Sequence, residues 1–390
     1  MDGPLGAPWA RHSRPVAVAA PLPAAPGAGE AAPRRRRWHG LGIAAVVVLL
    51  AVLAGVAVEH YRSPAAPPPA PASAGPAGID VAAVAAKVGP SLVNIEVKLG
   101  LDGGGAAGTG IVLSADGLVL TNNHVVEGAV EVRAVDAGRG RPYPAAVLGY
   151  DRSHDIAVLK LDGASGMTPA QLGDSAKVLV GAGVVGLGNA GGLGGKPVVS
   201  PGRVTALGQS ITASDETTGA TETLTGLIQV DADIRSGDSG GSLADSQGRV
   251  IGVDTASGAG YQFDEGQRPH EGYAIPINQA AAIAAEIVAG RASSTVHIGP
   301  SAFLGLTVVD GGNGSGALIK SLVAGGPAAK IGLKPDLLVV AIDGQPVGSA
   351  TALITIMDTH HPGDQLKVTV AGGGGRQATA TVVPDRGPVG

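Results

Sequence analysis

The stretch "RSGDSGGSL", residues 235–243, places a single serine, Ser239, between an aspartate and a pair of glycines. It raises two interpretations, because the chain contains 64 glycines among its 390 residues. Ser239 is either a nucleophile or part of an ordinary glycine-rich turn. A serine hydroxyl is a poor nucleophile near neutral pH unless a histidine accepts its proton and a carboxylate orients that histidine. The choice therefore depends on whether such partners stand elsewhere in the chain.

His124 is the best candidate for the base, because it follows an apolar strand-like run in "LVLTNNHVVEG" (118–128). A buried structural histidine is the alternative there. Asp155 opens the apolar run "DIAVLKL" (155–161), where the chain enters a core, and Asp151 is its rival. Most aspartates at such places cap turns. The order His124, Asp155, Ser239 is that of one of the unrelated folds that use a catalytic triad, which makes the set stronger than any single member.

The glycines next to Ser239 have a mechanical role in this interpretation. Gly237 lets the backbone turn so that its N–H and the N–H of Ser239 converge on one point, where they can bind the oxyanion of a tetrahedral intermediate. Gly240 and Gly241 give the chain space to leave the crowded turn.

Composition narrows the class of protein. The net charge of −5 with 15% charged residues gives no reason to expect a nucleic-acid partner. There is no cysteine, which excludes disulfides, cysteine-ligated zinc and a cysteine nucleophile. Several short runs are rich in β-branched residues, which favours strands.

The N-terminal part is predicted to carry a membrane anchor. Residues 38–58 form an apolar stretch close to the thickness of a bilayer, directly after Arg34 to Arg37. The positive-inside rule puts those arginines in the cytoplasm and the rest of the chain outside it. Residues 1–37 are predicted to be a disordered cytoplasmic tail, and the Pro/Ala-rich residues 59–78 an extended linker. The alternative is a cleaved signal sequence, which would give a secreted protein.

Two domains are predicted beyond the linker, at 79–290 and 299–388, joined by a short polar connection at 291–298. The first begins with a short helix that stops before Gly89-Pro90 and continues as many short apolar runs, including a hairpin around 115–117. It ends in a helix that stops at Gly290. This pattern predicts an all-β barrel or sandwich. The second domain mixes strands with two helical runs near 326–332 and 350–358.

These motifs together resemble the trypsin-like serine proteases of the HtrA/DegP family, most closely the actinobacterial exported proteases of PepA type. The likeness lies in "TNNHVV", "DIAVLKL" and "RSGDSGGSL", with support from "VVGLGNAGG" and "GYAIPINQA". It covers roughly residues 79–388. The resemblance implies a mainly β fold with two barrels, no cofactor, and an endopeptidase that acts on unfolded or damaged exported proteins. It assigns the triad to His124, Asp155 and Ser239, and the oxyanion hole to Gly237 and Ser239.

The second domain resembles a PDZ domain with an α+β fold. In that resemblance Phe303, Leu304, Gly305 and Leu306 form the loop that binds the carboxylate of a peptide C-terminus. An added peptide strand and backbone N–H groups around its carboxylate would supply the binding. An ordinary hydrophobic strand is the alternative. The chain has Asp336-Leu337 where the family usually has Gly-Asp, which affects the turn at that place.

Two aspartates depart from the HtrA pattern. Asp238 stands where many bacterial relatives have asparagine, and we expect it to be solvated or paired within the protein, since a buried unpaired carboxylate is costly. Loop order around it is predicted to tune activity. Asp233 stands near the expected floor of the specificity pocket. Either it favours cleavage after lysine or arginine, or Arg235 neutralises it.

A second class of function fits the same sequence: a peptide-binding chaperone or scaffold that retains the fold with little hydrolysis. The presence of all three triad residues favours the enzyme. Relatives often form trimers through aromatic contacts at the start of the protease domain, and residues 79–98 contain no aromatic residue. A monomer and a homotrimer therefore both stay open.

Overall fold

The computed structural model describes residues 78–100, 103–215, 221–255, 261–263 and 271–390. The predicted cytoplasmic tail, the membrane segment 38–58 and nearly all of the linker lie outside these residues. Within the described ranges, no helix is both long and apolar enough to cross a membrane. Helix α2, Val81–Val88, is the first helix of the described residues. The side chain of its N-cap, Asp80, accepts a hydrogen bond from the Ala83 amide.

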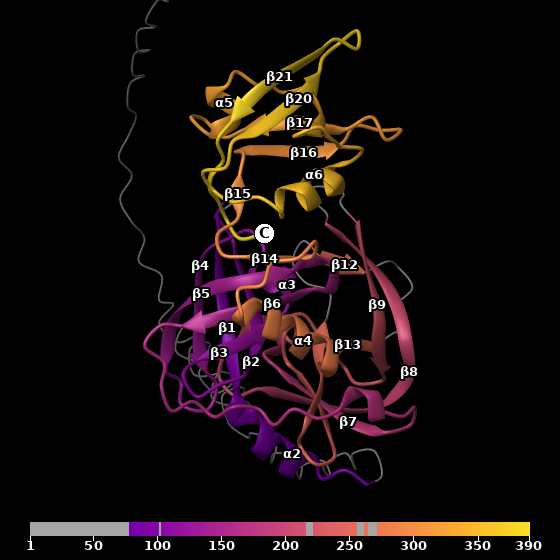
Figure 1. Ribbon diagram of the computed structural model, residues 1–390. Helices are drawn as coiled ribbons and strands as arrows, with labels where there is room; N and C mark the ends of the chain where they lie inside the picture. Colours follow the sequence, from indigo (N-terminus) through magenta and orange to yellow (C-terminus); the bar gives the residue numbers. More distant parts are fainter. Residues whose placement is uncertain (1–77, 101–102, 216–220, 256–260, 264–270) are drawn as a thin grey trace, which may run out of the picture. The chain divides into compact units, whose positions relative to one another are not determined.

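The first sheet closes into a barrel. Its strand order is β14-β5-β4-β1-β2-β3-β6, and an additional pairing of β5 with β6 joins the ends (Figure 1). The hairpin predicted around 115–117 is confirmed, because β2 pairs antiparallel with β3, with Ile111 opposite Leu120. The strands are β1 (Leu92–Leu99), β2 (Gly105–Val112), β3 (Leu118–Thr121), β4 (Ala129–Asp136), β5 (Pro142–Asp151), β6 (Ile156–Leu161) and β14 (Val296–Ile298).

The second sheet closes in the same way. Its order is β12-β8-β7-β10-β11-β13-β9, with β8 also paired to β9. The polar stretch after residue 211 belongs to a long hairpin, because β8 and β9 pair as far as Ser214 and Thr221. The strands are β7 (Gly183–Gly188), β8 (Val198–Asp215), β9 (Thr221–Val230), β10 (Ser242–Asp245), β11 (Val250–Thr255), β12 (Tyr261–Phe263) and β13 (Gly272–Pro276).

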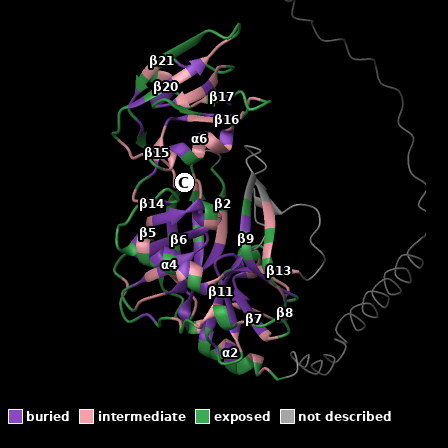
Figure 2. Ribbon diagram, turned by 45° about the vertical axis from the view of Figure 1, so that its right-hand side comes forward, coloured by how far each residue is buried: buried purple, intermediate pink, exposed green. Residues whose placement is uncertain are grey.

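Three groups of buried side chains hold this part of the chain together. One fills the first barrel, with Val93, Leu159 and Tyr143 among its members, and another fills the second, with Val184, Val230 and Leu243. The largest group joins residues of both sheets to α2 and to α4, Ile277–Val288. Figure 2 shows the buried residues concentrated in these strands. The two barrels therefore share a common apolar interface, so residues at their junction are held by both.

The second domain is an α+β unit with its own core, which includes Ile319, Val339 and Val368. Its main sheet runs β16-β17-β18-β20-β21, with β19 beside β18, and β15 pairs separately with β22. The two predicted helical runs are present as α5 (Pro327–Lys330) and α6 (Ala350–Met357). The strands are β15 (Ala302–Phe303), β16 (Leu306–Asp310), β17 (Ala317–Leu322), β18 (Leu338–Ile342), β19 (Gln345–Pro346), β20 (Leu366–Ala371), β21 (Gln377–Val382) and β22 (Asp385–Arg386).

The helix predicted before Gly290 is present as α4, and Gly290 follows it with φ of +66°. Residues 291–298, predicted as a connection, include β14, which pairs with β5 of the first barrel. The two-barrel arrangement expected from the sequence is confirmed by the closed pairings of both sheets.

Candidate active site

His124 lies at the start of a short helix, α3 (Asn123–Val126), just beyond β3. Its side chain is 7% exposed. The backbone N–H of His124 donates to Asp155 Oδ1 at 3.0 Å, while its ring Nδ1 lies 3.0 Å from Oδ1 and 2.9 Å from Oδ2. One carboxylate thus fixes both the main chain and the ring of the histidine, which directs Nε2 away from Asp155.

Asp155 is held in an unusual backbone conformation, with φ of 52° and ψ of 47°. Such values are uncommon outside glycine and mark positions that the surroundings must enforce. Two contacts do so. The side-chain amide of Asn122 donates to the Asp155 carbonyl oxygen at 2.9 Å, and Thr255 Oγ1 donates to Asp155 Oδ2 at 3.2 Å. Asp155 is therefore positioned by both barrels, since Asn122 follows β3 and Thr255 ends β11.

Asp151, the rival candidate, has a local role. Its Oδ1 accepts from the His154 amide at 3.1 Å and from Ser153 Oγ at 2.7 Å, and its Oδ2 lies 2.8 Å from His154 Nδ1. It caps the short 3-10 helix Arg152–His154. The structure brings Asp155, and not Asp151, to His124.

Ser239 is 3% exposed and lies in the turn between Ile234 and β10. Its carbonyl oxygen accepts from the Thr109 amide at 2.8 Å, which ties the turn to β2 of the first barrel. A Cβ built on Gly108 would lie 2.6 Å from Val125 Cγ1 and 3.2 Å from the Ser239 carbonyl oxygen. The residue next to His124 and the backbone of Ser239 therefore flank the same glycine.

Gly237 has φ of +94°, a conformation that favours glycine. Its carbonyl oxygen accepts from Thr109 Oγ1 at 2.8 Å, and a Cβ there would lie 2.9 Å from the Gly192 amide and overlap the Asn189 carbonyl oxygen. Because the carbonyl is held on one side, the peptide that contains it cannot rotate freely. The turn is fixed rather than a flexible glycine loop.

The next two glycines are equally constrained. Gly240 has φ of +81°, and a Cβ there would overlap the Thr109 carbonyl oxygen and Thr121 Oγ1. At Gly241 a Cβ would lie 2.7 Å from the Asp238 carbonyl oxygen. Neighbouring backbone occupies the space that a side chain would need at both positions. Only glycine therefore allows the chain to pass through this turn.

Asp238 is 3% exposed, so it is not solvated as one of the two expectations had it. Its Oδ2 accepts from the Arg235 amide at 3.0 Å, and no described residue gives Oδ1 a hydrogen bond. Burial raises the pKa of Asp238 to about 6. The amides of Arg235 and Ala190 and the charge of Arg235 lower the pKa, but by less than burial raises it. The pairing expected within the protein is therefore supplied by backbone amides.

Asp233 is ion-paired with Arg235, and both side chains are substantially exposed, at 39% and 67%. This is the arrangement of the second interpretation of Asp233, in which Arg235 neutralises it. The ion pair also raises the pKa of Arg235.

In the second domain, the four residues of the predicted carboxylate loop join β15 to β16. Gly305 has φ of +73°, and its carbonyl oxygen accepts from the Val323 amide at 2.8 Å. The Leu304 carbonyl oxygen accepts from the Ala328 amide at 2.8 Å. Asp336 has φ of +66°, so an aspartate adopts the left-handed conformation at the position where the family usually has glycine.

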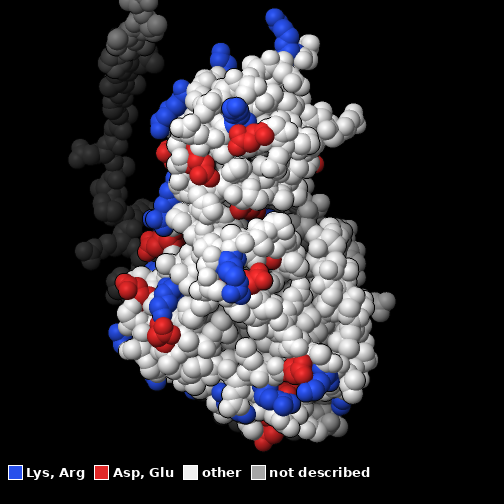
Figure 3. Space-filling view, viewed as in Figure 1, with Lys and Arg blue, Asp and Glu red and all other residues white. Residues whose placement is uncertain are grey.

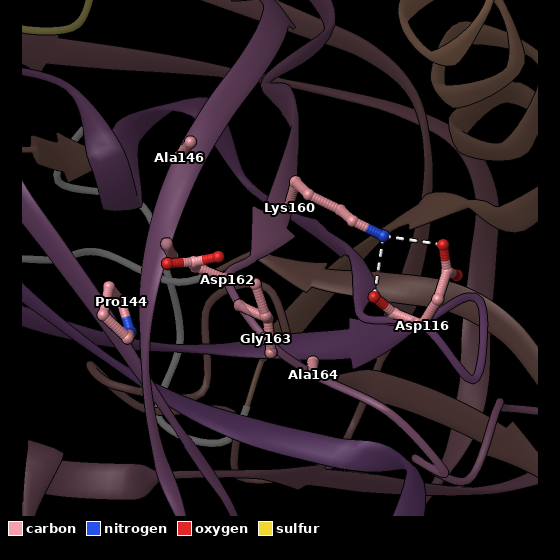
Figure 4. A pocket seen from close by; sticks show the side chains of 9 residues that line it. Asp116, Pro144, Ala146, Lys160, Asp162, Gly163 and Ala164 are labelled. Atoms are coloured by element: carbon pink, nitrogen blue, oxygen red, sulfur yellow. Dashed lines mark hydrogen bonds and ion pairs between the residues drawn. The ribbon is translucent and has the colours of Figure 1, made fainter.

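A surface pocket lies away from these residues. It is an open pocket of about 520 Å³ on the wall of the first barrel, lined by Asp116, Lys160, Asp162 and neighbouring small residues (Figure 4). Lys160 Nζ donates to the Asp116 carboxylate at 2.6 Å across its edge. The Lys160 hydrogen bond, followed by that of Ser114, lowers the pKa of Asp116 to about 2. The pocket contains no candidate catalytic residue.

Charged side chains are scattered over the face in Figure 3, where blue and red groups commonly lie side by side. No extended patch of one sign is visible on that face of the described residues.

Three positioning residues escaped the sequence interpretation: Thr109, Asn122 and Thr255. Asn122 stands two residues before His124 in "TNNHVV", so its proximity was a usable signal. Thr109 and Thr255 act through pairings between distant strands, which no local pattern reveals.

Two closed β-barrels, with a histidine–aspartate pair from the first and a constrained serine turn from the second, define a trypsin-like peptidase. A profile of the family described as trypsin-like peptidase domain matches residues 108–253, and the PDZ domain family matches residues 302–383.

Whole-chain comparisons place the protein more narrowly. The serine protease PepD of Mycobacterium tuberculosis is 35% identical over 367 residues, which cover 88% of this chain and 76% of PepD. The periplasmic serine endoproteases DegQ and DegP of Escherichia coli are each 31% identical over 271 residues, 67% of this chain. The matches cover 55% of DegQ and 53% of DegP. Among solved structures, the HtrA-type protease AlgW aligns with 78% of this chain and 96% of its own, at 26% identity and a TM-score of 0.46. This chain belongs to the HtrA/DegP family of serine proteases, with an actinobacterial relative as the sequence indicated.

Proposed function

We propose that this chain is a membrane-anchored endopeptidase that hydrolyses unfolded or damaged exported proteins through an acyl-enzyme at Ser239. The observation that supports this best is the contact of both Asp155 oxygens with His124 Nδ1, at 2.9 and 3.0 Å. A carboxylate in that place holds the proton on Nδ1 and leaves Nε2 as an acceptor.

The reaction then follows from the roles of the residues. His124 Nε2 takes the hydroxyl proton as Ser239 Oγ forms a bond to the carbonyl carbon of the scissile peptide. The amides of Gly237 and Ser239 donate to the resulting oxyanion, and each such donor contributes about 2.7–4 kcal/mol in acyl-transfer enzymes. His124 returns the proton to the leaving amine, and the acyl-enzyme is hydrolysed by water in the reverse order of steps.

The ion pair of Asp233 with Arg235 bears on specificity. Asp233 is already paired, so it would attract a lysine or arginine side chain of the substrate only weakly. An exposed ion pair also contributes little binding free energy. We therefore expect the residue before the cleaved bond to be apolar in the unmodified protein.

The second domain is proposed to bind peptide C-termini at residues 303–306. The left-handed conformation of Gly305 supports this, because successive amides in such turns can converge on an anion. Helix α6 packs against β16, so a peptide strand added beside β16 would have an apolar neighbour.

The proposed location is extracytoplasmic, with residues 38–58 as the anchor, or secreted if that segment is cleaved. The apolar length of the segment and the arginines before it support the anchor. The relatives DegP and DegQ are named as periplasmic proteins, which supports an exported catalytic domain.

The experiment is degradation of casein by the full chain, compared with Ser239→Ala and with Ser293→Ala as a control at an exposed serine. We expect hydrolysis by the unmodified protein and the control, and none by Ser239→Ala. Equal hydrolysis by Ser239→Ala would overturn the assignment. Absence of hydrolysis, with prevention of casein aggregation, would establish the chaperone alternative. The mass of the assembly in the same preparation distinguishes a monomer from a homotrimer.

A further inference from the structure

Arg152 stands three residues before Asp155 and supports it through the backbone. It begins the short 3-10 helix Arg152–His154, and its carbonyl oxygen accepts from the Asp155 amide at 3.0 Å. Asp155 follows that helix in the left-handed conformation, which the surroundings must enforce. A shift of the 3-10 helix would therefore move the Asp155 carboxylate, so the place of Arg152 bears on one half of the His124–Asp155 pair.

The side chain of Arg152 reaches the other half of the pair. Its Nη1 forms an ion pair with Glu127 Oε1. Glu127 is the C-cap of α3, the short helix that contains His124, and its amide donates to the Asn123 carbonyl oxygen at 2.9 Å. The Arg152 side chain is 10% exposed, so solvent ions screen this contact less than an exposed one. One guanidinium thus joins the end of the histidine's helix to the segment that leads into Asp155.

A residue of the second domain contacts the same guanidinium. Asp358 is the C-cap of α6, and its Oδ2 accepts from Arg152 Nε at 3.0 Å. Its Oδ1 accepts from the Tyr150 hydroxyl at 2.8 Å. Both parts of the protein belong to one compact unit of the chain. The Asp358 carboxylate is therefore held against the first barrel by Tyr150 and Arg152, and it holds Arg152 in turn.

The geometry of a guanidinium makes these two contacts informative. The group is planar and its N–H donors lie in a fixed fork, so contacts at two of its nitrogens determine its orientation. In Arg152 those contacts are Glu127 at Nη1 and Asp358 at Nε, from different domains. Loss of either carboxylate leaves a buried cation less well compensated, which is costly and favours other rotamers. The orientation of Arg152 toward the histidine's helix therefore depends on the second domain.

The end of α3 has a second contact with the C-terminal part of the chain. The Gly128 amide donates to the Val389 carbonyl oxygen at 2.7 Å, and the Val389 amide donates to the Ala129 carbonyl oxygen at 3.0 Å. The Val389 side chain packs against the apolar core of the first barrel. The residues that end the histidine's helix are thus held by two separate segments that lie beyond the protease domain in sequence.

A simple tie between the two domains is the alternative role for Asp358. Other contacts already provide such a tie: His297 Nδ1 of β14 lies 2.7 Å from the Asp358 carbonyl oxygen, and His361 Nε2 lies 2.9 Å from the Ile298 carbonyl oxygen. None of these three contacts includes α3 or the Arg152 side chain. Substitutions that spare them can therefore separate a positioning role of Arg152 from general contact between the domains.

We propose that Arg152 positions the His124–Asp155 pair, and that Asp358 of the second domain completes this arrangement, so that the second domain supports turnover itself. Neither residue touches the substrate, so both are positioning residues. Without Asp358, the Arg152 side chain would release the end of α3, and the distance from His124 Nδ1 to the Asp155 carboxylate would vary. The inference rests on the proposed function, because it concerns the same catalytic pair.

Kinetics with a short fluorogenic peptide tests the proposal, with the peptide's C-terminus amidated so that it offers no carboxylate to residues 303–306. A misplacement of about 1 Å can lower turnover about 10²-fold, so a loosened pair should lower kcat about tenfold at unchanged KM in Asp358→Ala and Arg152→Gln. The double variant should be no slower than Arg152→Gln alone, because Asp358 acts through Arg152.

Two control variants test the alternative. Tyr150→Phe removes the other hydrogen bond to the Asp358 carboxylate and should keep the kcat of the unmodified chain. Asp364→Asn changes an aspartate of the second domain that accepts from the His361 amide of the same domain, and it should also keep that kcat. An equal fall in Tyr150→Phe would overturn the proposal in favour of a simple tie between the domains.

An unchanged kcat in Arg152→Gln or in Asp358→Ala would also overturn the proposal. Circular dichroism checks that each variant is folded. If Arg152→Gln does not fold, Arg152→Lys takes its place, because lysine keeps the cation but lacks the fork that joins two carboxylates. It should show the same fall in kcat.

A proton NMR spectrum of the full chain gives a second readout that needs no activity. The Nδ1 proton of His124 lies between the ring and Asp155 and should give a downfield resonance that His124→Ala lacks. In Asp358→Ala the resonance should broaden through faster exchange with water, whereas in Tyr150→Phe it should not. An unchanged resonance in Asp358→Ala would contradict the proposal. Absence of hydrolysis by the unmodified chain would count against the proposed function, and the resonance would still decide whether Asp358 positions the pair.

Discussion

Replacing Asp238 by asparagine should change how the stability of the protein depends on pH. The pKa of Asp238 is raised from 3.8 to about 6 in the folded state because the carboxyl is buried. A raised folded-state pKa means that the folded protein holds this proton more tightly than the unfolded chain does. The stability linked to this proton is fully present below pH 3.8 and is lost as the pH rises through about 6.

The size of the effect follows from the shift. About 2 pKa units at about 1.4 kcal/mol each amount to about 3 kcal/mol, lost between about pH 4 and about pH 7. An asparagine does not titrate, so Asp238→Asn should avoid this loss. Relative to the parent, the variant should gain up to about 3 kcal/mol of unfolding free energy over that range.

Urea unfolding followed by circular dichroism measures this difference, in a Ser239→Ala parent that cannot digest itself. Asp162→Asn is the matched control, because Asp162 is an exposed aspartate of the first barrel. The difference between Asp162→Asn and the parent, measured at each pH, is subtracted from that of Asp238→Asn. A constant difference for Asp238→Asn between about pH 4 and about pH 7, or one of opposite sign, would refute the burial argument.

Three further outcomes are expected. Gly240→Ala should lower the melting temperature far more than Gly163→Ala. Both glycines have positive φ, but only at Gly240 would the added Cβ overlap neighbouring backbone. Gly163→Ala should lower the free energy of unfolding by only about 1–2 kcal/mol. Thr255→Val should lower kcat roughly tenfold at unchanged KM by removing a hydrogen bond to a charged carboxylate, while Thr255→Ser retains activity. Arg235→Ala should increase cleavage after lysine and arginine in a peptide library by exposing the aspartate it pairs with. An unchanged library profile would count against that role.

The local patterns predicted most of the secondary structure. Helix α2 before Gly89-Pro90, the hairpin at 115–117 and helix α4 before Gly290 follow from turn residues and apolar spacing, which act over a few positions. Closure of each sheet into a barrel involves strands far apart in sequence, and the resemblance to a known family supplied it rather than the pattern.

The candidate active site was likewise predicted only in part from the sequence. His124 and Asp155 were selected by their places beside apolar runs, and the structure brings them into contact. Asp238 was singled out, but the second buried carboxyl, Asp254, was not, because its burial follows from the pairing of β11 with β13. A carboxyl in "GVDTA" looks like an ordinary polar residue at a strand end until the barrel closes around it.

Labelling of the folded full chain by a fluorophosphonate, with the modified peptide identified by mass spectrometry, tests the central claim most directly. Such reagents attack an activated serine hydroxyl and not an ordinary one, because the reaction needs a base at the nucleophile. The account predicts one labelled residue, Ser239, with labelling lost in Ser239→Ala and greatly reduced in His124→Ala. A native protein that is not labelled, or is labelled with equal efficiency in His124→Ala, would contradict it.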